Sequence, residues 1–127
     1  MTILGHGIDL AECSRIGKVM ENHKRRFLDR ILTPAERERA ELYRNPLPFI
    51  TGRWAGKEAI LKMIGTGWRG KISWNDMEIL PNELGRPCVK LSGETARIAA
   101  EAGINRVLLS ITHTQHHAMA SAIGVGE

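Results

Sequence analysis

Aromatic residues and long apolar runs are scarce in this chain, and each scarcity excludes a class of function. Phenylalanine, tryptophan and tyrosine make up 5% of its 127 residues, too few for the stacking platforms that hold single-stranded nucleic acid. No apolar run approaches the roughly 20 residues that a membrane-spanning helix requires. The N-terminal stretch lacks a basic segment followed by a longer apolar one, so we expect neither a secretory signal nor a membrane protein.

Cysteine is scarce as well. The two cysteines, Cys13 and Cys88, lie far apart without CxxC spacing, which is typical of reduced thiols in a cytoplasmic protein. The length predicts one domain over residues 1–127. The formal net charge of +4 favours anionic partners, and an acidic protein or a phosphorylated small molecule fits as well as a nucleic acid. The one basic run, Lys24–Arg26, is too short to indicate nucleic acid.

The stretch 52–70 is the most informative part of the sequence. Strong helix formers up to Ile64 predict an amphipathic helix. Glycines at 65, 67 and 70 predict its end, because glycine adopts a positive φ without steric penalty. Ala55, Ala59 and Met63 share one stripe of this helix, and we expect that stripe to face the core.

Charged residues on the same helix suggest chemistry. Glu58 and Lys62 are four apart and lie on one side of the helix, while Arg53 and Lys57 form a second, basic row beside them. A carboxylate with three cations, next to a loop rich in backbone N–H groups, is suited to receive a metal ion and phosphates. Alternatively, Glu58 and Lys62 form only an exposed helix pair, and the helix alone does not decide between these interpretations.

The remaining elements alternate between strands and helices. Thr33 is predicted to cap a helix with Glu36 three residues later, and Ser92 to cap another that Gly103 closes. Together the elements predict an α+β domain with a largely antiparallel sheet. The predicted strands are 3–10, 72–80, 87–91, 106–112 and 118–125, and the predicted helices are 11–22, 34–43, 48–64 and 93–102.

Two further features have both a chemical and an ordinary interpretation. Asp9 is either a ligand of a hard cation such as Mg²⁺ or the cap of the following helix, and only the fold could bring it to Glu58. The turn with His113, His116 and His117 invites a zinc site, but adjacent histidines seldom converge on one ion. We favour His113 as a donor to phosphate and the other two as polar turn residues. The motifs of serine hydrolases, P-loop NTPases and dinucleotide-binding proteins are absent.

Several blocks together resemble the holo-acyl-carrier-protein synthase family of 4′-phosphopantetheinyl transferases. They occur in the family's order over nearly the whole chain, and their combination is far more specific than any single block. The blocks are GIDL at 7–10, FLDRILTPAE at 27–36, GRWAGKEA at 52–59 with Lys62 and GTG at 65–67, LGRP at 84–87 and SITHT at 110–114.

The resemblance implies Mg²⁺-dependent transfer of the 4′-phosphopantetheine arm from coenzyme A to a serine of an apo acyl carrier protein, with release of adenosine 3′,5′-bisphosphate. It assigns the metal to Asp9 and Glu58, and catalysis to these two with Lys62. Glu58 is the expected proton acceptor, and Glu36 is a weaker candidate for that role. The residues implied to bind coenzyme A are Arg53, Lys62, Gly65, Gly67, Pro87, His113 and Thr114.

The resemblance also implies a homotrimer whose subunits share the active sites. Acyl carrier proteins are acidic, and one of fatty-acid or of polyketide synthesis fits equally well. The expected docking surface for the carrier is the basic set Arg15, Lys18, Arg25 and Arg26. Two other functions stay open: a non-catalytic phosphate- or nucleotide-binding module of the same fold, and a small nucleic-acid-binding protein.

Overall fold

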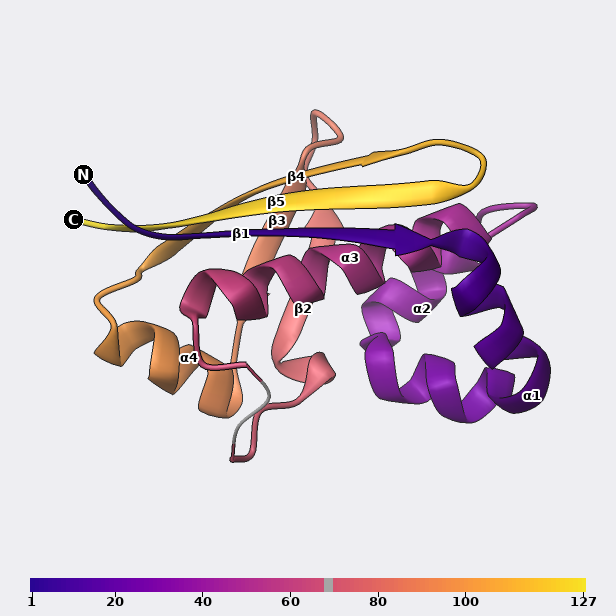
Figure 1. Ribbon diagram of the computed structural model, residues 1–127, viewed down its shortest axis with the longest axis horizontal. Helices are drawn as coiled ribbons and strands as arrows, with labels where there is room; N and C mark the ends of the chain where they lie inside the picture. The colour runs from indigo at the N-terminus through magenta and orange to yellow at the C-terminus, as the bar shows by residue number, and fades with distance from the viewer. Residues whose placement is uncertain (68–69) are drawn as a thin grey trace.

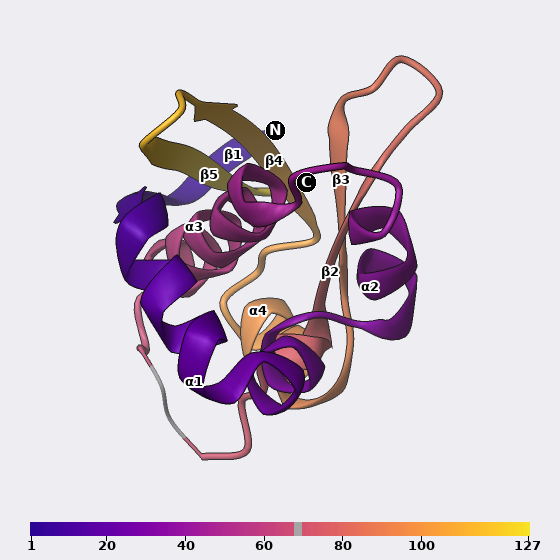
Figure 2. The same cartoon turned by 90° about the vertical axis from the view of Figure 1, so that its right-hand side faces the viewer.

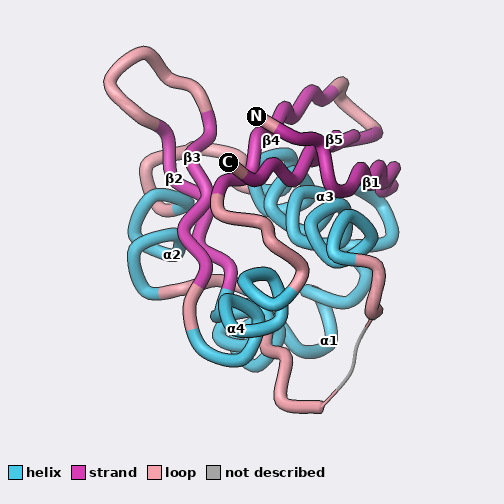
Figure 3. Tube along the Cα trace, turned by 90° about the vertical axis from the view of Figure 1, so that its left-hand side faces the viewer, coloured by secondary structure: helices cyan, strands magenta, loops and turns pink. Residues whose placement is uncertain are grey.

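The computed structural model describes residues 1–67 and 70–127 as two antiparallel sheets with helices around them (Figures 1 and 3). The larger sheet has the strand order β1-β5-β4, and β2 pairs with β3 in the smaller one. The predicted α+β class with antiparallel pairing is therefore confirmed. No helix in this described part is long and apolar enough to cross a bilayer. The elements are β1 Thr2–Glu12, α1 Cys13–Ile31, α2 Pro34–Ala40, α3 Leu47–Ile64, the 3₁₀ turn η1 Trp74–Asp76, β2 Met77–Pro81, β3 Pro87–Leu91, α4 Gly93–Glu101, β4 Arg106–His113 and β5 His117–Gly126.

Helix α3 is the centre of the fold. It packs against the larger sheet on one side, and α1 and β2 contact it on others (Figure 2). The predicted core stripe of α3 is confirmed, since its three residues are buried. The helix is nevertheless buried more completely than an amphipathic pattern predicts. Between Ile50 and Met63 the only residues that are not buried are Trp54, Glu58 and Lys62. Their spacing of four makes them a single open stripe along α3.

Glycines in β1 set the distance between the larger sheet and α3. A Cβ atom on Gly7 would lie 2.1 Å from the carbonyl oxygen of Ala59, and one on Gly5 would lie 2.3 Å from that of Met63. Real Cβ contacts are not this short, so only glycine fits at either position. The close backbone approach that these glycines permit brings β1 directly onto α3.

We predict that Gly7→Ala destabilises the fold by about 3 kcal/mol, because backbone of α3 cannot move away as the end of a flexible side chain could. Urea unfolding would measure the change. Gly17→Ala in α1 is the matched control: its Cβ would meet Leu47 at 3.5 Å, an ordinary contact. That change should be neutral or stabilising by up to about 1 kcal/mol. Equal stability of both variants would contradict the packing described for β1 on α3.

Helix α1 is longer than predicted. The sequence predicts a helix that ends near Asn22, but α1 continues to Ile31 past non-helical dihedral angles at His23. The basic run 24–26 therefore lies on a helix. The physical reason is tertiary, because Leu28 and Ile31 are buried in a second apolar cluster with Ile16 and Trp74.

The strand predicted over 72–80 is wrong for its first half, where η1 replaces it. Ser73 caps this turn, since its hydroxyl accepts from the backbone N–H of Asn75 at 3.3 Å. The backbone N–H of Ser73 in turn donates to the carboxylate of Asp76, 3.3 Å away. The same carboxylate caps α4 by accepting from the backbone N–H and the hydroxyl of Thr95. Ser92, the predicted cap of α4, makes no side-chain cap bond. The predicted end of α4 is confirmed, because Gly103 has φ 82°.

Candidate active site

The open stripe of α3 lies beside Asp9 of β1. The ammonium group of Lys62 donates to the Asp9 carboxylate at 3.0 Å and to the carbonyl oxygen of Ile8 at 3.1 Å. Asp9 is not a helix cap, because β1 continues to Glu12 before α1 begins. The ordinary interpretation of Asp9 is therefore wrong. The fold brings this carboxylate to the same side of α3 as Glu58 and Lys62, which the sequence could not establish.

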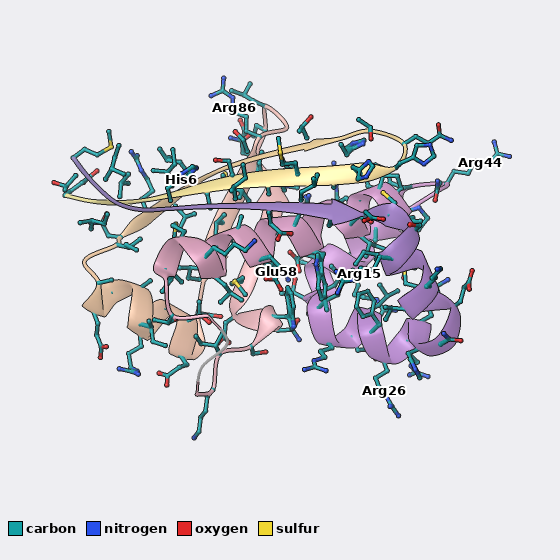
Figure 4. All side chains as sticks on the ribbon, viewed as in Figure 1. His6, Arg15, Arg26, Arg44, Glu58 and Arg86 are labelled. Carbon is teal, nitrogen blue, oxygen red and sulfur yellow. The ribbon has the colours of Figure 1, made fainter. Side chains whose placement is uncertain are left out.

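Asp9 and Glu58 line one hollow of about 260 Å³, which we call the carboxylate hollow. Glu12, Arg15 and Trp54 contribute to its walls, and Figure 4 shows Glu58 and Arg15 side by side between α3 and α1. Within residues 1–67 and 70–127, no group of three or more His, Cys, Asp or Glu side chains is placed to hold a metal ion. Two carboxylates still suit Mg²⁺, which commonly takes one or two and completes its shell with water and substrate phosphates.

Aromatic side chains form a wall next to this hollow. Trp54 and Trp74 stack with ring centroids 4.4 Å apart, and Phe27 stacks on Trp54 at 5.8 Å. An adjoining hollow of about 350 Å³ is lined by both tryptophans with Arg30 and Glu58. The sequence pattern predicted no role for these aromatic residues. Their scarcity was a usable signal, because three of the few aromatic rings meet beside Glu58.

A second pocket, the arginine pocket, has a volume of about 360 Å³ and gathers Arg53, Pro87 and His113 with Arg39 and Phe49. The Arg53 guanidinium lies 4.2 Å over the Phe49 ring. Burial lowers the pKa of Arg53, and the negative charge of Glu36 opposes that shift. Three of the residues expected to bind coenzyme A thus line one pocket, together with Arg39, which sequence reasoning missed.

The carboxylate hollow and the arginine pocket lie on different sides of α3. Arg53 and Glu58 are five residues apart on a helix, which places their side chains about 140° apart around its axis. None of the described residues lines both spaces. One chain therefore does not bring Arg53, Pro87 and His113 to Asp9, Glu58 and Lys62.

Lys62 lies beside the carboxylate hollow through its contact with Asp9, whereas Gly65, Gly67 and Thr114 line neither space. Gly65, with φ 87°, ends α3 beyond Lys62, and Gly67 follows it with φ 64°. Thr114 belongs to the turn between β4 and β5, where its hydroxyl accepts from the backbone N–H of His117 at 3.1 Å. The third glycine of the predicted loop, Gly70, follows two residues that lie outside the described part of the chain.

Lys57 and Glu36 were both predicted to face a ligand, but neither belongs to the site. Both side chains are fully buried, and their N–O distance is 2.7 Å. Burial lowers the pKa of Lys57, and the charge of Glu36 opposes this. Lys57 therefore cannot contact phosphates. The prediction that it is one of three cations near a ligand is wrong. Glu36 is equally unsuited to accept the serine proton, because no substrate can reach it.

The predicted docking residues lie along α1. Arg15, Lys18, Arg25 and Arg26 are exposed, and Arg15 also lines the carboxylate hollow. Arg26 points away from the body of the molecule on the far side of α1 from the sheet (Figure 4). His116 is exposed in the β4–β5 turn, and His117 is exposed at the start of β5. Both cysteines are free thiols, with Cys13 buried and Cys88 exposed.

Comparison with known proteins gives the family of this chain. The family model for the 4′-phosphopantetheinyl transferase superfamily matches residues 5–121. The holo-[acyl-carrier-protein] synthase of Caldanaerobacter subterraneus subsp. tengcongensis is 47% identical over 94% of this chain and 93% of its own length. The enzyme of the same name from Desulforudis audaxviator is 44% identical over 98% and 94%.

Solved structures give the same result. The holo-[acyl-carrier-protein] synthase of Neisseria meningitidis superposes with a TM-score of 0.90 at 31% identity, covering 98% of this chain and 99% of its own. The synthase of Bacillus anthracis, solved in complex with coenzyme A (3′,5′-ADP), superposes with a TM-score of 0.83 at 32% identity over the whole of both chains.

The fold and the family match define the class: this chain belongs to the 4′-phosphopantetheinyl transferase superfamily. The curated relatives described above are holo-[acyl-carrier-protein] synthases, and the similarity covers almost their full length. The enzyme class that the sequence blocks implied, a holo-[acyl-carrier-protein] synthase, is therefore confirmed.

Proposed function

We propose that this domain, residues 1–127, transfers the 4′-phosphopantetheine arm of coenzyme A to a serine of an acidic apo acyl carrier protein in an Mg²⁺-dependent reaction. The observation that carries this proposal is the meeting of Asp9 and Glu58 in one hollow beside Lys62. Mg²⁺ held there would neutralise the diphosphate of coenzyme A as its P–O bond breaks.

The chain's own residues then have separable roles. Glu58 accepts the proton of the carrier serine, whose oxygen forms the new bond to the phosphate of the pantetheine arm. The bond between the two phosphates breaks, and adenosine 3′,5′-bisphosphate leaves with the bonding electron pair. Lys62, which is exposed enough to reach a ligand while it contacts Asp9, stabilises the charge that develops on the leaving group.

The nucleotide end of coenzyme A fits the arginine pocket, where Arg53 and His113 would contact its phosphates. Since that pocket and the carboxylate hollow lie on different sides of α3, one ligand cannot reach both within a single chain. We therefore propose that each active site joins the hollow of one subunit to the pocket of its neighbour in a homotrimer.

The outer face of the larger sheet is the surface that suits such an assembly. Its exposed apolar residues are Ile8, Leu10, Leu108 and Met119. The strand register places Leu10 beside Met119 and Ile8 beside Ser121. Several large apolar side chains exposed on one face of a sheet are a feature that we expect of a protein interface.

The test of the activity is the intact mass of an apo acyl carrier protein after incubation with coenzyme A, Mg²⁺ and this protein. A mass gain equal to one phosphopantetheine arm would support the proposal. Binding of coenzyme A without any mass gain, over several carrier proteins, would favour the non-catalytic binding module instead.

We predict that reversing two charges of α1, in Arg15→Glu/Arg26→Glu, raises the KM for the carrier protein about tenfold and weakens its dependence on salt. The single variant Arg26→Glu should leave the KM for coenzyme A within about twofold, because Arg26 lines neither space, whereas Arg15 lines the carboxylate hollow. Steady-state kinetics at several ionic strengths would measure both constants. Unchanged kinetics for the carrier would reject α1 as the docking surface.

A further inference from the structure

An ion pair lies in the core at the junction of four elements. Lys57 of α3 and Glu36 of α2 are both fully buried, and each is hydrogen-bonded at every charged atom. The Lys57 ammonium donates to the carbonyl oxygen of Ile31 at 2.6 Å, to Oε1 of Glu36 at 2.7 Å and to the carbonyl oxygen of Trp74 at 3.2 Å. This one group therefore connects α3 to the end of α1, to α2 and to η1.

Glu36 continues the chain of contacts to the smaller sheet. Its Oε1 also accepts from the backbone N–H of Thr33, which completes the predicted capping box of α2. Its Oε2 accepts from the backbone N–H of Ile79 at 2.8 Å. The carbonyl oxygen of Ile79 accepts from Nε of Arg53 at 3.0 Å. Both backbone groups of Ile79 are thus bonded to side chains of α2 and α3.

These contacts lie at the edge of β2 that faces away from β3. Strand β2 pairs with β3 on one side, with Ile79 opposite Val89. Within the described part of the chain this sheet has no third strand. Unpaired backbone groups in a buried position are costly, and here Glu36 and Arg53 satisfy them in place of a strand. The position of the β2–β3 hairpin therefore depends on a carboxylate that Lys57 holds.

The hairpin is a wall of the arginine pocket. Pro81, Gly85 and Pro87 line the pocket from this hairpin, which projects beyond the body of the molecule (Figure 2). Arg53 lines the same pocket while it bonds to Ile79. We propose that the Lys57–Glu36 pair is a positioning element of the coenzyme A site: it fixes the hairpin wall and Arg53 relative to α3. This inference rests on the proposed function of the arginine pocket.

A purely structural role makes a different prediction. Replacing a buried ion pair by apolar residues of similar volume is often neutral or stabilising, whereas removing one partner leaves a costly unpaired charge. The variant Lys57→Met/Glu36→Leu removes both charges together and also the bond to Ile79. If the pair only stabilises the core, a folded double variant will bind coenzyme A normally.

The first experiment compares the double variant with wild type in calorimetric titrations of coenzyme A and in steady-state transfer. We expect the Kd and the KM for coenzyme A to rise about tenfold, because the hairpin wall and Arg53 lose a fixed position. The KM for the carrier protein and kcat at saturating coenzyme A should change by less than about threefold, because the carboxylate hollow keeps its residues. A folded double variant with an unchanged Kd for coenzyme A would overturn the inference.

A second variant decides the question if the double variant does not fold. Glu36→Gln keeps an oxygen acceptor for Lys57 and Thr33 but turns an NH₂ group toward the N–H of Ile79, so it removes that bond. It also removes the charge that opposes the Lys57 ammonium. We expect faster hydrogen exchange at the Ile79 amide together with weaker binding of coenzyme A. Protection of Ile79 equal to wild type, or normal binding despite lost protection, would contradict the proposal.

The matched control is Arg97→Met/Glu101→Leu, which removes an exposed ion pair of α4 and should change neither readout. If the wild-type protein bound no coenzyme A, the proposed function would fail. Exchange at Ile79 would still show separately whether the buried pair holds the edge of β2.

Discussion

Replacing Asp9 or Glu58 with alanine is expected to lower the rate of phosphopantetheine transfer by about 10³-fold, because either change removes one of the two carboxylates that would hold Mg²⁺ against the diphosphate. The two substitutions act on one unit, so the double variant should be little worse than either single one. Chelation of Mg²⁺ should reduce the wild-type rate to a similar level, and addition of Mg²⁺ should restore it.

The two single variants should nevertheless differ in how far added Mg²⁺ restores their rates. Glu58 is the proposed proton acceptor, whereas Asp9 contributes only to metal binding and to the contact with Lys62. Raising the concentration of Mg²⁺ should therefore recover part of the rate in Asp9→Ala and much less of it in Glu58→Ala. The measurement is the mass of the modified carrier over time at several concentrations of Mg²⁺.

The control for these variants is Glu38→Ala, which removes an exposed carboxylate of α2 away from the carboxylate hollow. It should transfer at the wild-type rate. Thermal unfolding of all variants would test for a loss of fold. We expect no such loss, because Asp9 and Glu58 are not core residues. Full activity in Asp9→Ala would show that the metal site is placed wrongly.

Local signals in the sequence predicted much of the fold correctly. The capping box at Thr33 and Glu36 and the glycine end of α4 depend on neighbours within a few residues, and both are present. The glycines of β1 permitted close packing, and α3 lies on them. The helical spacing of apolar residues also predicted the buried stripe of α3, because the residues that share a helix face follow from their spacing alone.

The errors arose where distant parts of the chain decide the outcome. Lys57 was assigned to a phosphate-binding row because its spacing matches Arg53, yet its partner Glu36 lies 21 residues away. Nothing local distinguishes a lysine that meets such a partner from one that faces solvent. The resemblance blocks included both residues, which was compatible with a structural role as well as a chemical one.

The split of the site between two sides of α3 has the same origin. Arg53 and Glu58 occur in one sequence block, and proximity in sequence suggested proximity in space. The helical repeat separates them, and only the packing of the sheet and the hairpin determines what each side faces. A second subunit is then the simplest way to bring a carboxylate hollow and an arginine pocket together in one site.

Placing a charge on the outer face of the larger sheet should dissociate the proposed trimer and abolish transfer. Met119→Arg lies on the central strand β5, opposite Leu10 and Thr112, and its charge would be buried without a partner in a trimer. Such burial costs several kcal/mol, so we expect a monomer and a loss of activity of at least about 100-fold. Light scattering coupled to chromatography would give the mass. Ala102→Arg, at the exposed end of α4, is the control and should remain assembled and active.

Mixing two inactive variants tests the shared site directly. Glu58→Gln disables the carboxylate hollow, and Arg39→Ala/His113→Ala removes two exposed side chains of the arginine pocket. In a random equal mixture, each site draws its two halves from different subunits, so about a quarter of the sites combine an intact hollow with an intact pocket. We therefore expect about a quarter of the wild-type rate after joint refolding of the two variants. If each chain formed its own site, the mixture would be as inactive as its components, because every chain carries one defect.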